Sequence, residues 1–140
     1  MRFAPMVAVT ALGLVGCSDN TLPSTELDLR DLAPVQWTMR VGEERTIEGL
    51  RVTFGGVPQD SRCPTEVLCP WSGNAVASIE VGPVTGRGPS FPLSLNTSIE
   101  PRHGSAYGLR ITLISLRPEP RTPGPIREQD YEAELRASGQ

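Results

Sequence analysis

The sequence predicts an all-β domain: an antiparallel β-sandwich or partly open barrel of about seven strands, placed after an N-terminal signal peptide. Glycine and proline each contribute 14 of the 140 residues, and aromatic residues only 5%. This composition favours short strands joined by turns and disfavours long helices. Several segments alternate apolar and polar residues, the two-residue period of a half-buried strand, and no segment carries a sustained helical apolar stripe.

Four strands are expected in the first half of the domain. The clearest alternation is at Leu50, Val52 and Phe54, which are separated by polar residues. The pair Gly55-Gly56 is expected to end that strand, and Gly82-Pro83 to end the fourth. The expected ranges are 36–40, 45–49, 50–54 and 74–81, the last with Ala75, Ala77, Ile79 and Val81 on one face.

Three strands are expected in the second half, over 90–96, 107–116 and 130–137. The first should lie at a sheet edge, because Pro92 has no N–H to donate to a neighbouring strand. The single histidine, His103, is expected in a polar turn. Inward-facing residues of the last two strands are Leu109, Ile111, Leu113, Tyr131, Ala133, Leu135 and Ala137.

The N-terminus has the order of a secretory signal. Arg2 precedes an apolar run over 3–15, and small residues precede Cys17. The run is shorter than the ~20 residues that a membrane-spanning helix needs. The sequence Leu14-Val15-Gly16-Cys17 resembles the lipobox of bacterial lipoproteins. The resemblance implies cleavage before Cys17, which would carry a thioether-linked diacylglycerol and an amide-linked acyl chain.

Three regions are therefore expected along the chain. They are a lipoprotein signal peptide at 1–16, a polar tether at 17–34 and a single β domain at 35–140. An alternative for part of the tether is that Leu27, Leu29 and Leu32 form an edge strand or a helical turn of the fold. The expected location is the bacterial cell envelope, with the domain in the periplasm or at the cell surface. Ser18 favours the outer membrane over the inner one, under the sorting rule of enteric bacteria.

Charge and cysteine content narrow the function classes. All 13 basic residues are arginines, they form no run, and the net charge is -3, so a nucleic-acid partner is not expected. Three cysteines are present, and acylation of Cys17 would leave Cys63 and Cys69. In an oxidising envelope these two can form one disulfide that closes a short loop. Such a closure would raise the free energy of unfolding by roughly 2 to 2.5 kcal/mol.

The cysteines lie in the most unusual stretch of the chain, residues 60–73, which read D-S-R-C-P-T-E-V-L-C-P-W-S-G. It is similar to a segment of small bacterial secreted proteins and lipoproteins, in which D-S-R-C-P and a short spacer precede C-x-W-x-G and a strand. This resemblance implies relatives but no activity. Trp71 is expected to pack over the disulfide or to cap one end of the sandwich, and Asp60 and Ser61 to hydrogen-bond local backbone.

Several functions are compatible with this segment. It is a structural staple, or a rigid binding loop that uses Asp60, Arg62 and Trp71. A protease-inhibitor-like loop would present Arg62 or Leu68. A metal or small-ligand site would use the Cys63 to Trp71 loop, with Asp60 and His103 as further metal ligands, although the spacing is not that of a zinc site.

Catalysis is not expected, because there is no G-x-S-x-G motif and only one histidine. The sequence therefore predicts a lipid-anchored, non-enzymatic structural or interaction module without a cofactor. Its partners would be the membrane, through Cys17, and an unidentified envelope protein or ligand.

Overall fold

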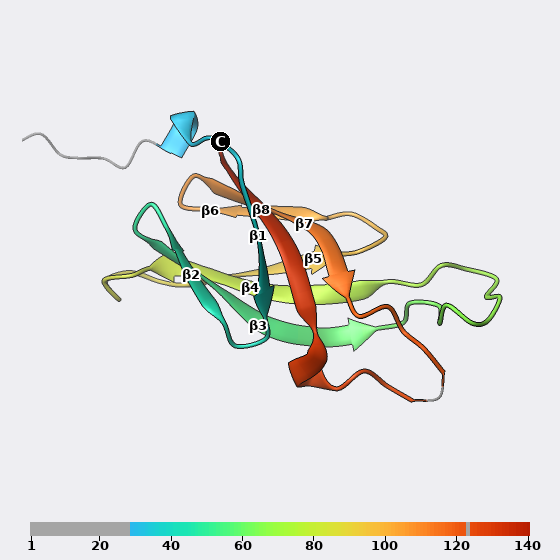
Figure 1. The fold of residues 1–140 in the computed structure, drawn as a ribbon. Coiled ribbons are helices and arrows are strands. Elements are labelled where there is room, and N and C mark those ends of the chain that lie inside the picture. The colour runs from blue at the N-terminus through green and yellow to red at the C-terminus, as the bar shows by residue number, and fades with distance from the viewer. Residues whose placement is uncertain (1–28, 123) are drawn as a thin grey trace, which may run out of the picture.

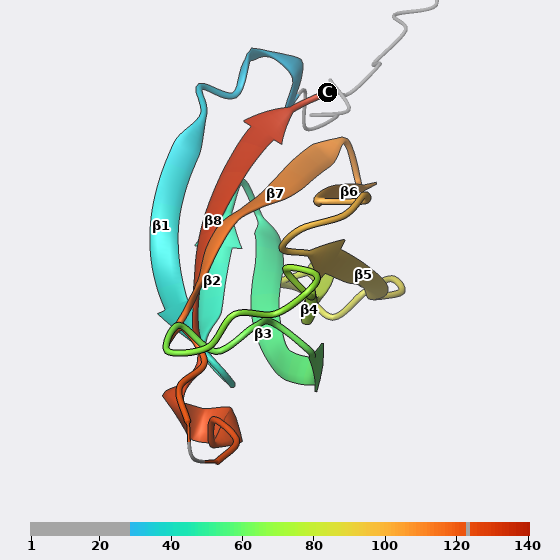
Figure 2. The same ribbon diagram turned by 90° about the vertical axis from the view of Figure 1, so that its right-hand side faces the viewer.

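The computed structural model describes residues 29–122 and 124–140, which form an open β-sandwich (Figures 1 and 2). Two antiparallel four-stranded sheets pack face to face, in the orders β1-β8-β7-β6 and β2-β3-β4-β5. The predicted all-β class is confirmed, with a sandwich rather than a closed barrel and with eight strands. They are β1 Val35–Arg40, β2 Glu44–Ile47, β3 Leu50–Asp60, β4 Ala75–Pro83, β5 Phe91–Asn96, β6 His103–Ala106, β7 Leu109–Arg117 and β8 Glu132–Gly139, with short 3₁₀ helices η1 Leu29–Asp31 and η2 Glu128–Asp130.

Alternation places the core as the sequence predicts. The inner faces of the two sheets interdigitate, and strand residues that point inward are inaccessible to solvent. Pro92 lies on β5, which is an edge strand as expected. Tyr131, directly before β8, is buried, and so are the predicted inward residues of β3, β4, β7 and β8: Leu50, Val52, Phe54, Ala75, Ala77, Ile79, Val81, Leu109, Ile111, Leu113, Ala133, Leu135 and Ala137.

The prediction that Gly55-Gly56 ends the third strand is wrong. Strand β3 continues to Asp60, and its register with β4 shifts on both sides of Gly56. Gly56 has φ 133°, a conformation that side chains rarely adopt, so the glycine permits an irregularity inside the strand instead of a turn. The longer strand carries Asp60 to the end of the sandwich.

A further strand, β6, occupies the place where a polar turn was expected. His103 is the first residue of this exposed edge strand, and the true turn is the two-residue connection Tyr107-Gly108. Both turn residues have positive φ, 54° and 76°, which is the geometry of a tight hairpin turn. The sequence did not predict this turn, because tyrosine is unusual at a turn position with positive φ. Strand β7 therefore begins at Leu109, and the predicted start at Tyr107 is wrong.

The packed domain begins inside the stretch that was predicted as tether. In η1, Leu29 is only 4% exposed and lies against Gly108 and Gly139, and Leu32 packs beside the core. Leu29 thus lies in a helical turn that packs on the domain, as the alternative to a tether predicts, and Leu32 follows this turn; Leu27 lies outside the described residues. The signal peptide and Cys17 lie outside the described residues. Within residues 29–122 and 124–140, no helix is long and apolar enough to cross a membrane.

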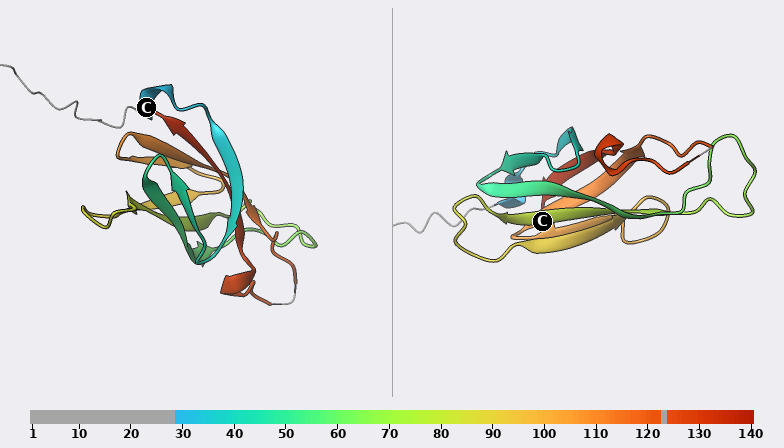
Figure 3. Two further views of the ribbon diagram at one scale, coloured as in Figure 1. Left: turned by 60° about the vertical axis from the view of Figure 1, so that its left-hand side comes forward. Right: turned by 90° about the horizontal axis from the view of Figure 1, so that it is seen from below.

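The sandwich has two distinct ends (Figures 1 and 3). One end, which we call the N-terminal end, holds η1, the C-terminus, the β4–β5 turn and the Tyr107-Gly108 turn. We call the opposite end the loop end. It holds the β3–β4 connection, residues 61–74, which we call the cysteine loop. It also holds the β5–β6 and β7–β8 connections. Because β3 has 11 residues, it spans about 35 Å between the two ends.

Candidate binding loop

The cysteine loop leaves β3 and returns to β4 as a braced hairpin. Cys63 and Cys69 form the predicted disulfide, with a Cα–Cα distance of 6.0 Å. Below it, the backbone N–H of Ser61 donates to the carbonyl of Asn74 at 2.8 Å, and that of Cys63 to the carbonyl of Ser72 at 3.0 Å. The base of the loop therefore continues the β3–β4 ladder, and the disulfide closes its outer part.

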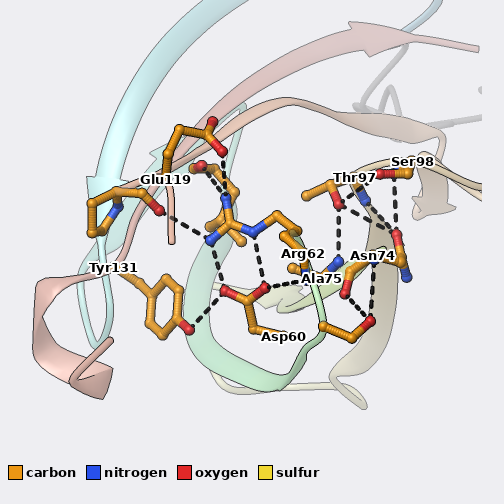
Figure 4. Close-up of polar contacts among 11 residues, drawn as sticks. Asp60, Arg62, Asn74, Ala75, Thr97, Ser98, Glu119 and Tyr131 are labelled. Carbon is orange, nitrogen blue, oxygen red and sulfur yellow. Dashed lines mark hydrogen bonds and ion pairs between the residues drawn. The ribbon is translucent and has the colours of Figure 1, made fainter. Parts of the chain in front are cut away.

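Arg62 fixes the base of this loop to the opposite sheet (Figure 4). Its side chain is only 8% exposed. The guanidinium donates to both carboxylate oxygens of Asp60, at 2.9 and 2.7 Å, and to the carbonyls of Leu116 and Pro118, at 2.8 and 3.0 Å. Glu119 adds a weaker ion pair at 3.7 Å. One buried cation thus connects the end of β3 to the chain that follows β7.

Tyr131 completes the cluster from the start of β8. Its hydroxyl donates to Asp60 Oδ2 at 2.9 Å. Burial raises the pKa of Asp60, but hydrogen bonds from the Arg62 side chain and backbone and from Tyr131 outweigh burial, so the pKa lies below its ordinary value. Burial and the hydrogen bond to the Asp60 carboxylate raise the pKa of Tyr131 to about 12. The carboxylate is therefore held charged and the phenol neutral around pH 7.

A second set of hydrogen bonds holds the return side of the loop. The side-chain carbonyl of Asn74 accepts from the backbone N–H groups of Thr97 and Ser98, both at 3.1 Å, and its amide donates to Asn96 Oδ1 at 2.7 Å. These contacts tie the loop to the β5–β6 connection. Both ends of the cysteine loop are therefore fixed to the sandwich.

The tip of the loop is apolar and open to solvent. Leu68 is fully exposed, Trp71 is 70% exposed and Val67 is 45% exposed. The expectation that Trp71 packs over the disulfide or caps the sandwich is therefore wrong. A short loop stapled by the disulfide and followed by Pro70 leaves the indole no buried surface to reach.

The predicted binding residues thus separate into two groups. Asp60 and Arg62 are internal anchors, so Arg62 is not available as the presented residue of an inhibitor-like loop. Leu68 and Trp71 are the residues that a partner can touch. Sequence reasoning missed Tyr131 as a partner of Asp60; the available signal was a tyrosine on the inward face of the last strand, whose hydroxyl needs a buried acceptor.

The metal alternative finds little support in the donor atoms present. Both sulfurs of the loop are in the disulfide, so neither is a thiolate. His103 lies on β6, in the other sheet. In the part of the chain that the structure describes, no three His, Cys, Asp or Glu side chains are grouped to hold a metal ion. A small ligand would have one hollow beside the loop, of about 290 Å³, which is lined by Arg62, Cys63, Ser72, Thr97, Ser98, Leu113, Ile114, Ser115, Leu116 and Glu119.

Comparisons with known proteins add no relative: no protein-family model, curated protein or solved structure matches this chain. The function is therefore argued from the arrangement of the loop itself.

Removing the disulfide is expected to loosen the tip but not to unfold the domain. Changing Cys63 and Cys69 to alanine removes the constraint of a short closed loop, and we expect the free energy of unfolding to fall by about 2 kcal/mol. The Arg62 cluster remains in this variant, so the fold persists. Urea unfolding followed by circular dichroism measures the change. A loss above about 4 kcal/mol would mean that the disulfide, and not Arg62, holds the loop base.

Proposed function

We propose that this chain is a lipid-anchored protein of the bacterial cell envelope that acts as a non-enzymatic interaction module. The tip of the cysteine loop binds a partner protein. The single observation that carries the binding role is the full exposure of Leu68 and the 70% exposure of Trp71 on a loop whose base is fixed by a disulfide and a buried arginine.

Rigidity is what makes an exposed apolar tip suitable for binding. A loop that is already ordered loses little conformational freedom when a partner covers it, so more of the contact energy becomes affinity. Tryptophan is among the residues that contribute most at protein interfaces, because it buries a large area in one rigid side chain. Leu68 beside Trp71 supplies a second apolar contact.

The position of the tip agrees with an anchor at Cys17. The anchor rests on the lipobox resemblance, and the chain from Cys17 enters the domain at η1, at the N-terminal end. The cysteine loop lies at the opposite end (Figure 3). A domain held by its N-terminal end points the tip away from the lipid, toward proteins of the envelope space or of an opposing layer.

Removing the tip side chains is expected to abolish partner binding without changing the fold. A photoreactive residue in place of the exposed Pro70 should give one discrete protein adduct in cells, and Trp71→Ser in the same chain should lower its yield at least tenfold. Stability should change by less than about 0.5 kcal/mol, since Trp71 is 70% exposed.

The matched control places the photoreactive residue at Thr46, an exposed position on β2. The same adduct from Thr46, or an adduct that survives Trp71→Ser, would contradict a binding role for the tip. The anchor has its own test: the intact mass of the protein extracted from membranes must equal that of the chain from Cys17 plus its acyl groups.

The small-ligand alternative predicts something different. A ligand in the hollow beside the loop would touch Arg62, Ser72 and Ser115 and leave Leu68 and Trp71 bare. If the function is to bind such a ligand, adding it should not change the yield of the protein adduct formed from position 70. A protease-inhibitor-like loop could present only Leu68 of the two predicted residues, because Arg62 is buried.

A further inference from the structure

The exposed apolar side chains of the molecule gather at its two ends. Large apolar residues with substantial exposure are absent from the outer faces of both sheets in residues 29–122 and 124–140. One group, at the loop end, consists of the tip residues and Ile99. The other, at the N-terminal end, consists of Val84, Phe91 and Tyr107, which are 36%, 44% and 41% exposed. The second group is not used by the proposed partner-binding tip.

We call these three residues the aromatic end patch, in which Phe91 and Tyr107 are the contacting pair. The rings of Phe91 and Tyr107 meet edge to face, with centroids 5.4 Å apart. The Tyr107 hydroxyl donates to the carbonyl of Pro89 at 2.6 Å, which ties the β6–β7 turn to the β4–β5 turn. Val84 lies in the same β4–β5 connection. Phe91, at the start of β5, and Tyr107 are thus held together at this end, and Val84 is exposed in the adjoining turn.

Tyr107 occupies a backbone position that favours smaller residues. It is the first residue of the two-residue turn, with φ 54°, where asparagine and glycine are preferred. A bulky aromatic residue at positive φ is unusual. The ring is held at the surface by Phe91 and Pro89, with 41% of the residue left exposed.

We propose that the aromatic end patch rests on the lipid bilayer to which Cys17 anchors the chain. This inference depends on the proposed anchor. Eleven residues lie between Cys17 and Leu29, so the chain between them spans at most about 40 Å. Leu29 lies against Gly108, directly beside Tyr107. The patch is therefore next to the point at which the anchored segment enters the domain.

The chemistry of the patch suits a membrane interface. Aromatic rings with one polar atom concentrate at the level of lipid headgroups, and Tyr107 beside Phe91 is such a pair. Arg87 and Arg110 are exposed at the same end and can meet anionic headgroups, and Asp31 in η1 and Glu48 in the β2–β3 turn are exposed acids at this end. A patch this small binds weakly alone, but the anchor keeps it close to the lipid surface.

The test places a reporter indole in the patch. The full, lipidated chain carrying Tyr107→Trp and Trp71→Phe is reconstituted in phosphatidylethanolamine–phosphatidylglycerol vesicles that contain brominated lipid, a quencher of indole fluorescence. Buried Trp37 is common to this chain and to the chain with Trp71 in place, so the difference in quenching reports on positions 107 and 71. We expect the quenching of the indole at 107 to exceed that of Trp71 at least threefold, because the cysteine loop, which carries Trp71, lies at the opposite end (Figure 3). Adding Val84→Ser and Phe91→Ser should reduce the quenching to the level of Trp71.

Two outcomes of this experiment would overturn the inference. A chain whose lipidation is verified by mass but whose new indole is quenched no more than Trp71 keeps the anchor and refutes the bilayer contact. Stronger quenching of Trp71 would place the loop end, and not the aromatic end patch, on the lipid. A chain that carries no acyl group at Cys17 refutes the anchor and, with it, this inference.

The variant Tyr107→Asn separates a membrane role from a structural one. Asparagine suits the left-handed turn but loses the contacts with Pro89 and Phe91, so the thermal midpoint should stay close to that of the wild type. Amide hydrogen exchange in the β4–β5 turn, residues 84–90, is therefore compared for each chain between vesicles and detergent, and the protection that vesicles add should be about fivefold smaller in the variant. Equal vesicle-dependent protection in the two chains would show that Tyr107 serves the fold alone.

Discussion

Replacing Arg62 by leucine is expected to lower the free energy of unfolding by about 3 to 5 kcal/mol. The substitution leaves the Asp60 carboxylate, whose side chain is only 12% exposed, without its cation. It also leaves the carbonyls of Leu116 and Pro118 without their donor. An uncompensated buried charge costs far more than a surface ion pair contributes. Urea unfolding of the full chain with its disulfide intact measures the loss.

Two further variants determine which part of the Arg62 contacts matters. Arg62→Lys keeps the charge but not the fork that reaches both Asp60 oxygens, so an intermediate loss is expected. Combining Asp60→Asn with Arg62→Leu removes both charges, so the double variant should lose less than the sum of the single losses. A loss below about 1 kcal/mol for Arg62→Leu would contradict the buried anchor and indicate a pair screened by solvent.

The sequence predicts the core of this fold because burial on one face of a strand is a local property. The residues Ala75, Ala77, Ile79 and Val81 repeat every second position, and a single reading of the chain places them on one face. The errors lie where backbone conformation departs from residue preference. Gly56 continues a strand that its type suggests should end, and Tyr107 makes a turn that its type disfavours.

The candidate site was harder to predict because its contacts are distant in sequence. The disulfide pairs residues six positions apart, and cysteine counting was sufficient to predict it. Asp60 is two positions from Arg62, but the carbonyls that Arg62 binds on the other sheet are 54 and 56 positions away, and Tyr131 is 71 positions from Asp60. No local pattern carries such information. The sequence therefore located the loop. It placed Arg62 among the binding residues, although the side chain is buried, and it left open whether Trp71 packs on the domain or faces a partner.

Alkaline pH is expected to destabilise the domain through Tyr131. Its pKa is about 12 in the folded chain and is 10.0 as an ordinary value. A group whose pKa is raised by folding contributes stability that is fully present below the unfolded pKa. The contribution is therefore complete below about pH 10 and is lost as the pH rises to about 12. Two pKa units correspond to about 3 kcal/mol, measured by urea unfolding at a series of pH values.

Stability is also expected to fall at acid pH, and this loss comes from Asp60 and not from Tyr131. The acid and alkaline losses can therefore be separated by mutation. Because the folded pKa of Asp60 is lowered, its contribution is present above the ordinary pKa and is lost as the pH falls through the folded value. Tyr131→Phe should remove the alkaline loss and keep the acid one, at the expense of about 1 kcal/mol for the missing hydrogen bond. Asp60→Asn should remove the loss of stability at acid pH. An alkaline loss that persists in Tyr131→Phe would mean that another group titrates there and that the phenol is not held by the Asp60–Arg62 pair.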